Sequence, residues 1–176
     1  MKRNAGFANA VFRRSSRTAL ASVCEVIVIA ALVAACGGAG AGVTATQIPF
    51  TDHGSTQQSD YDGGPRIIAT TDPAATGLGQ LASPDAGRLY IAVYAGSQRT
   101  GGYGIRVVRI DRAGDTLTVR AMFSSPAPDA ITIQVLTSPA NLVSIDRQQA
   151  ASAREVVLVD QTAAERARGT VQQSQP

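Results

Sequence analysis

From Arg88 onward, apolar residues alternate with polar residues along much of the chain, and this period-two pattern restricts the fold more than any other feature of the sequence. Successive side chains of a β-strand point to opposite faces of a sheet, so alternation of this kind predicts strands. It is clearest at Leu117, Val119 and Ala121, and turn residues recur at the short intervals typical of antiparallel sheets. The pattern predicts a mainly β domain, either a small antiparallel β-sandwich or an open barrel, with one or two short helices.

Details of the pattern predict individual features of the sheet. Residues 88–94 are apolar on both faces, which is typical of a central strand covered on both sides. The apolar phase then shifts before Val108 and Ile110, which predicts a β-bulge. Gly114 predicts a hairpin loop over residues 111–115, because short loops require a positive φ. Further strands are expected at residues 131–135, 142–145 and 155–159.

The region before this pattern predicts one strand and one weak helix. Residues 66–70 have the composition of a short strand. Asp72 followed by Pro73 predicts a helix start, with the aspartate as N-cap and the proline in the first turn. Gly77 and Gly79 each disfavour a helix by about 1 kcal/mol relative to alanine, so this helix should have no more than two turns.

Two further segments are expected to be irregular or only locally ordered. After a strand-like fragment at residues 48–50, residues 51–62 are polar without periodicity, and we expect a loop there. Near the C-terminus, Thr162 and Glu165 predict a capping box for a short helix that ends at Gly169. The glutamine-rich residues that follow predict a disordered tail.

The N-terminal residues resemble a bacterial lipoprotein signal peptide. A basic leader precedes an apolar segment at residues 26–32, and small residues then precede Cys36. The alternative, an uncleaved membrane helix, is disfavoured because the apolar segment is shorter than the roughly 20 residues that a membrane span requires. The resemblance implies export, cleavage after Ala35 and a lipid such as palmitate on Cys36, and Gly37 favours the outer membrane, facing the periplasm or the surface. The expected organisation is a signal peptide (1–35), a lipidated cysteine and flexible linker (36–46), a single β-rich domain (47–161), and a short helix and tail (162–176).

Composition excludes several classes of function once the leader is removed. Five of the 16 Lys and Arg residues and one of the 13 acidic residues precede Cys36, which leaves 11 basic and 12 acidic residues. The exported chain is therefore close to neutral and has no basic cluster, so we expect no nucleic-acid partner. Both cysteines lie within the first 36 residues, so the domain has no disulfide.

Within the β-rich region, four blocks of sequence resemble the C-terminal domain of the PrcB family. They are Val93-Tyr94-Ala95-Gly96, Thr100-Gly101-Gly102-Tyr103-Gly104-Ile105, Ser124-Ser125-Pro126-Ala127-Pro128 and Gln134-Val135-Leu136-Thr137-Ser138-Pro139. The similar segment covers residues 88–146, and departs from the family pattern at Ala127, Asp129 and Ala140. The family is named for a lipoprotein partner of a surface-anchored bacterial protease complex. The resemblance implies a non-enzymatic accessory role in the cell envelope, with an exported protease or another envelope protein as partner.

The candidate partner-binding residues are Arg99, Thr100, Gly101, Gly102 and Tyr103. Two glycines leave backbone amides unshielded, and the tyrosine adds a large amphipathic surface, so this tip could receive another chain. The alternative is a hairpin turn in which the glycines satisfy geometry and Tyr103 packs in the core.

The sequence predicts no catalytic, cofactor or metal site. His53 is the single histidine, and no catalytic motif surrounds it or the neighbouring Asp52. Residues 60–63 begin like a calcium loop, but the later ligands are missing, so a solvated turn is expected. Three functions stay open: a lipid-anchored accessory module for a protease, a protease inhibitor that binds through residues 100–103, and a structural envelope lipoprotein without a specific partner.

Overall fold

The computed structural model describes residues 44–172. The predicted signal peptide, Cys36 and most of the linker lie outside the described residues, as do the last four residues of the predicted tail. No helix among residues 44–172 has both the length and the apolar character that a membrane span requires.

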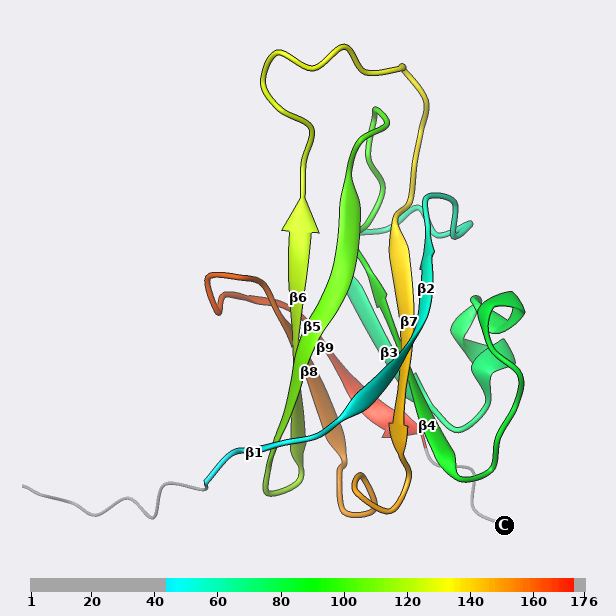
Figure 1. Ribbon diagram of the computed structural model, residues 1–176, viewed down its shortest axis with the longest axis vertical. Helices are drawn as coiled ribbons and strands as arrows, with labels where there is room; N and C mark the ends of the chain where they lie inside the picture. Colours follow the sequence, from blue (N-terminus) through cyan, green and yellow to red (C-terminus); the bar gives the residue numbers. More distant parts are fainter. Residues whose placement is uncertain (1–43, 173–176) are drawn as a thin grey trace, which may run out of the picture. The chain divides into compact units, whose positions relative to one another are not determined.

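Nine strands within the described residues form one curled sheet with the shape of a half-barrel (Figure 1). Its strand order is β1-β5-β6-β8-β9-β3-β4-β7-β2. The strands are β1 (Thr46–Gln47), β2 (Phe50–Thr56), β3 (Arg66–Thr70), β4 (Arg88–Tyr94), β5 (Gly104–Ala113), β6 (Thr116–Ser124), β7 (Ala140–Asp146), β8 (Glu155–Val159) and β9 (Glu165–Gln172). The prediction of a mainly β domain is confirmed, in the open-barrel form.

The N-terminal strands connect the two ends of this sheet. β1 pairs with β5, and β2, which follows almost at once, pairs with β7 at the opposite end of the strand order. Between them, the amide of Ile48 donates to the carbonyl of Ile110 at 2.8 Å. Figure 1 shows this cyan segment crossing the face of the sheet. The segment therefore covers the opening of the half-barrel.

The predicted short helix is present as two 3-10 helices, η1 (Pro73–Thr76) and η2 (Gly79–Leu81). The Asp72 carboxylate caps η1 by accepting a hydrogen bond from the Ala74 amide at 2.9 Å. Gly77 ends η1 with a left-handed φ of 78°. Glycine is favoured there because a Cβ makes this conformation costly.

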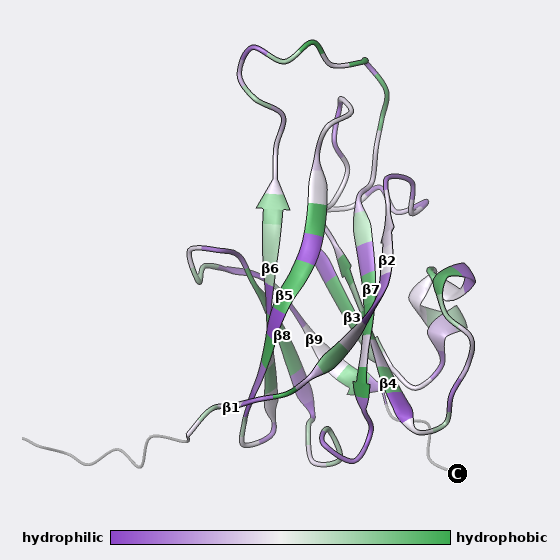
Figure 2. Cartoon of the chain, in the orientation of Figure 1, coloured by the Kyte–Doolittle hydropathy of each residue, from purple (hydrophilic) through white to green (hydrophobic). Residues whose placement is uncertain are grey.

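β4 is the central strand that its sequence predicts, and each face is covered by a different hydrophobic cluster. Leu89, Ile91 and Val93 belong to the main core, together with buried residues of β5, β6, β7 and β8. Tyr90 and Tyr94 belong to a smaller cluster on the other face, which Leu78 joins from the helical segment. Figure 2 shows hydrophobic positions recurring along the strands.

The predicted bulge and hairpin are also confirmed. The register between β5 and β6 shifts between Val107 and Arg109, and Ile110 is fully buried as a result. Val108 is part of the bulge itself and stays 45% exposed. Gly114 has a φ of 63° in the hairpin that joins the two strands.

Three local predictions are wrong. Residues 50–56 form β2, although the segment is polar: an edge strand is held by its backbone pairing with β7, and none of its residues is fully buried. Residues 131–135 are an exposed loop and not a strand.

The third error is the C-terminal helix, since residues 165–172 form β9. This strand pairs antiparallel with β8 and parallel with β3, and the pairing on both sides outweighs the local capping signal. The preceding turn is held by the Asp160 carboxylate, which accepts hydrogen bonds from the amides of Thr162 and Ala164 at 2.8 and 3.1 Å. Gly169 faces β3, and a Cβ there would lie 3.0 Å from the Ile67 carbonyl oxygen.

Candidate functional site

Two loops meet at one end of the sheet, and we call residues 97–103 and 125–138 together the loop end. Gln98 and Thr137 form an antiparallel bridge, with amide-to-carbonyl distances of 2.8 and 2.9 Å. The Thr137 hydroxyl donates to the Thr100 carbonyl at 3.0 Å. Figure 1 shows the yellow loop, residues 125–139, arching above the green one. The predicted tip is therefore held against a second and longer loop.

The two glycines of the tip allow the loops to approach closely. The Gly101 amide donates to the Ile133 carbonyl at 3.1 Å, and a Cβ at Gly101 would lie 3.3 Å from the Ile133 side chain. Gly102 has a φ of 91°, and a Cβ there would lie 3.1 Å from Pro126. The glycines thus satisfy local geometry, and the Gly101 amide is already used within the chain.

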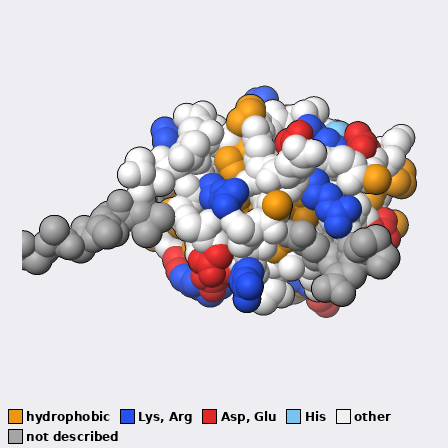
Figure 3. Space-filling view, turned by 90° about the horizontal axis from the view of Figure 1, so that it is seen from below, with side chains coloured by type: hydrophobic (Ala, Val, Ile, Leu, Met, Phe, Trp, Pro, Cys, Tyr) orange, Lys and Arg blue, Asp and Glu red, His pale blue; other side chains and the backbone are white. Residues whose placement is uncertain are grey.

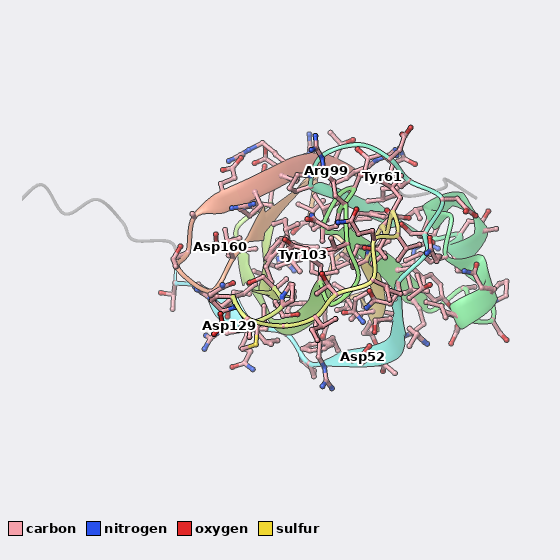
Figure 4. All side chains as sticks on the ribbon, turned by 90° about the horizontal axis from the view of Figure 1, so that it is seen from above. Asp52, Tyr61, Arg99, Tyr103, Asp129 and Asp160 are labelled. Carbon is pink, nitrogen blue, oxygen red and sulfur yellow. The ribbon has the colours of Figure 1, made fainter. Side chains whose placement is uncertain are left out.

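Tyr103 and Arg99 are the accessible side chains of the tip. Tyr103 is half-buried and belongs to neither core cluster, so it is not packed in the core as the alternative prediction required. Arg99 is exposed, and Figure 4 shows it and Asp129 on opposite sides of Tyr103. These two residues carry the only charges within the loop end. That residues 99–103 bind a partner stays a prediction.

A groove with a volume of about 710 Å³ lies between the two loops. We call it the loop groove. Gly101, Gly102 and Tyr103 line one part of it, and Gln57 and Gln58 line another. The long loop contributes Pro126, Ala130, Ile131, Thr132, Ile133, Val135 and Thr137. The residues that line the groove are thus uncharged, and several of them are aliphatic.

The long loop exposes aliphatic side chains to an unusual degree. Ile131 is fully exposed, Ile133 is 73% exposed and Leu136 is 62% exposed. Figure 2 shows hydrophobic positions along this loop, above the sheet. Soluble proteins seldom expose such residues side by side except where a partner binds. The sequence does not reveal this site, because alternation at residues 131–135 also fits a strand, although Pro126, Pro128 and Pro139 signal an interruption of the sheet.

His53 takes part in a serine–histidine contact, but the geometry does not suit catalysis. Its Nε2 lies 2.8 Å from the Ser144 Oγ. Ser144 is fully buried, and its Oγ also accepts a hydrogen bond from the Arg88 Nε at 3.0 Å. A nucleophile must reach its substrate, and this hydroxyl cannot. Asp52 does not orient the imidazole either, since its Oδ1 accepts hydrogen bonds from the Gly54 amide and the Asn141 side chain at 2.9 Å each.

Within residues 44–172, no group of three or more His, Cys, Asp or Glu side chains is arranged to hold a metal ion. Asp60, at the start of the segment that begins like a calcium loop, has a φ of 53°, which is a turn conformation.

Comparison with known families places the loop end inside a recognised segment. Residues 89–146 match the family model described as PrcB C-terminal. The PrcB C-terminal segment spans β4 to β7 and includes both loops of the loop end, and its match confirms the resemblance seen in the sequence. Neither a curated protein nor a solved structure gives a significant match to the chain.

Proposed function

We propose that the chain is a lipid-anchored, non-enzymatic accessory module of the bacterial cell envelope that binds an exported protease through the loop end. The observation that carries this proposal is the exposure of Ile131 and Ile133 beside Tyr103, on an end of the sheet with few charges. Burial of aliphatic and aromatic side chains supplies most of the energy of protein association. The PrcB C-terminal match over the same segment supports a protease as the class of partner.

The anchor and the location rest on the sequence. The leader, the apolar segment and Cys36 have the order of a lipoprotein signal, so we propose an outer-membrane module that faces the periplasm or the surface. The absence of a catalytic role rests on the buried state of Ser144 beside the single histidine.

The test is crosslinking in intact cells, followed by isolation of the full chain through a C-terminal tag. Tyr103→Ala and Ile131→Ser each remove one apolar contact of the loop end. Val108→Ser is the matched control, because Val108 is an exposed aliphatic residue on β5, outside the loop end. We expect a protease to be recovered with the parent and the control, and at least about fivefold less of it with the two loop variants, since a well-placed contact contributes 1 kcal/mol or more. Equal recovery with all four chains would refute binding at the loop end.

A second candidate, a protease inhibitor, is favoured by one observation. Ile131 is fully exposed on a loop without helix or strand, and the two ends of this loop continue into β6 and β7. An exposed loop held at both ends can occupy a substrate cleft. An activity assay of the recovered protease separates the two functions: an accessory module leaves its activity unchanged or raises it, whereas an inhibitor lowers it. In the inhibitor case, a bulky residue at Gly101 or Gly102 should restore activity.

A further inference from the structure

The beginning of β5 forms part of the wall of the loop groove. Tyr103 and Gly104 line the groove, and Ile105 follows them directly. No charged side chain lines it, and Figure 4 shows the two charges of the loop end, Arg99 and Asp129, on opposite sides of Tyr103. Figure 3 shows a different character at the end of the molecule seen from below, where acidic and basic side chains are interspersed. The loop groove therefore favours an uncharged ligand.

The main-chain groups of Ile105 point away from β6. The Val107 amide donates to the Asn141 Oδ1 at 2.9 Å, so the main chain of Val107 faces away from β6. Residues two apart on a strand direct their main-chain groups to the same side, and the bulge begins only after Val107. Phe123, the partner of Ile105 on β6, confirms this direction. Its amide and carbonyl are bonded to the side chain of Gln161, which follows β8 on the opposite side of β6 from β5.

This edge of β5 carries main-chain groups that lack partners. Within residues 44–172, no strand pairs with the outward side of Ile105, and the main chain of Tyr103 makes no hydrogen bond. β1 covers the same side of β5 but pairs with it only at Asp111 and Arg112. Ile105 is 4% exposed, and main-chain groups at such positions are nearly always paired in folded proteins. The beginning of β5 is therefore a short strand edge without a pairing strand.

We propose that an extended, uncharged segment of the partner pairs with this edge of β5 as an added strand and places its side chains in the loop groove. The inference rests on the proposed function, because it names the element of the exported protease that the loop end receives. Main-chain hydrogen bonds to Tyr103 and Ile105 supply affinity, and the aliphatic lining of the groove selects the side chains. The added strand ends before Val107, since Asn141 already occupies that amide.

This arrangement is the reverse of an inhibitor loop, because the protease supplies the segment and the present chain supplies the groove. The probe is a synthetic peptide, acetyl-Thr-Val-Thr-Val-Thr-amide, which is uncharged and favours an extended conformation. The purified full chain, labelled with ¹⁵N, is titrated with this peptide. We expect saturating shifts of the Tyr103 and Ile105 amide signals and slower hydrogen exchange at Ile105. The Val107 amide is the internal control, because its bond to Asn141 is present with and without the peptide.

Modified peptides and variants separate strand pairing from side-chain contact. A fully N-methylated peptide keeps its side chains but donates no main-chain hydrogen bond, and should bind at least about 10-fold more weakly. A peptide with aspartate and lysine in place of the valines should also bind more weakly, because no charged side chain lines the groove. Ile105→Pro removes an amide that β6 does not use and should weaken binding about fivefold or more. Ile105→Val, the matched control, keeps the amide and should bind the peptide as the parent does.

Any of five results would overturn the proposal. They are shifts that do not saturate, equal binding of the N-methylated peptide, equal binding of the charged peptide, unchanged affinity in a folded Ile105→Pro variant, and Ile105 shifts that follow protein concentration without peptide. The last result would show that a second copy of the chain pairs with this edge. If Ile105→Pro fails to fold, the N-methylated peptide tests the pairing on the parent chain.

The peptide titration and the crosslinking experiment are separate readouts, so the two proposals can fail independently. A protease recovered through the loop end without peptide binding would overturn strand addition alone. Peptide binding without a recovered protease would overturn the accessory function alone.

Discussion

The side chain of Asn141 on β7 links β2 to β5, which lie at or next to opposite ends of the strand order. Its removal should strongly destabilise the fold. Its Nδ2 donates to the Gly54 carbonyl on β2 at 2.8 Å and to the Asp52 carboxylate at 2.9 Å. Its Oδ1 accepts from the Val107 amide of the β5 bulge, also at 2.9 Å. Asn141 is 1% exposed, so water does not replace these bonds when they are lost.

The magnitude for Asn141→Ala follows from the groups left unpaired. The Val107 amide is buried, and a buried donor without a partner costs about 1–3 kcal/mol. The Gly54 carbonyl loses a hydrogen bond worth about 1 kcal/mol, whereas the Asp52 carboxylate is partly exposed and can be solvated. The sum is a destabilisation of about 2–4 kcal/mol, a large part of the roughly 5–15 kcal/mol that stabilises a typical domain.

Urea unfolding followed by circular dichroism measures this loss. With a slope of about 2 kcal/mol per molar urea, the midpoint should fall by about 1–2 M. Thr118→Ala is the control: this residue lies on β6 between buried positions, makes no side-chain hydrogen bond among the described residues, and should change stability by less than about 0.5 kcal/mol. A decrease in the free energy of unfolding of less than about 1 kcal/mol for Asn141→Ala would show that β2 and β5 are held in place without this side chain, and would refute the reasoning.

The other predictions concern the two close backbone approaches and the turn before β9. Gly102→Ala should destabilise the fold by about 1–3 kcal/mol, because its φ of 91° is strained for any residue with a Cβ; an unchanged melting temperature would contradict this. Gly169→Val should lower the melting temperature by separating β9 from β3, and hydrogen exchange should show faster exchange in β9 than in the parent. Hydrogen bonding by the Thr162 hydroxyl lowers the pKa of Asp160, so its carboxylate stabilises the fold above about pH 4, and that contribution is lost as the pH falls through the folded-state pKa. Asp160→Asn should therefore flatten the acid side of the stability curve, and a parallel curve would count against this role.

The features that sequence predicted well are those in which local pattern and tertiary environment agree. β4 is apolar on both faces and is buried on both faces. The shift in apolar phase after Val107 marks the bulge, because a one-residue slip would otherwise turn Ile110 to solvent. Gly114 marks the hairpin, since the backbone there requires a positive φ.

The two missed strands, β2 and β9, have polar sequences because they bury little. β2 lies at an end of the strand order, and β9 alternates between exposed and half-buried positions. The half-buried residues of β9 include Ala167 and Gly169, and at Gly169 a Cβ would lie 3.0 Å from the Ile67 carbonyl oxygen. Hydrophobic periodicity cannot reveal a strand whose inward side chains are small and whose pairing depends on distant parts of the chain.

At the loop end, the sequence predicts a strand that the fold does not contain, and the exposure of the residues concerned points to function. Alternating isoleucines at 131 and 133 predict a strand, and a strand would have buried one face of them. The chain instead keeps these residues outside the sheet, on a loop fixed by Gln98 and Thr137 at its base. Exposure of this kind opposes the hydrophobic effect, and nothing in the packing of the sheet requires it. A sequence that is locally consistent with its fold elsewhere violates that consistency here, which is the behaviour expected of a binding site and not of a structural loop.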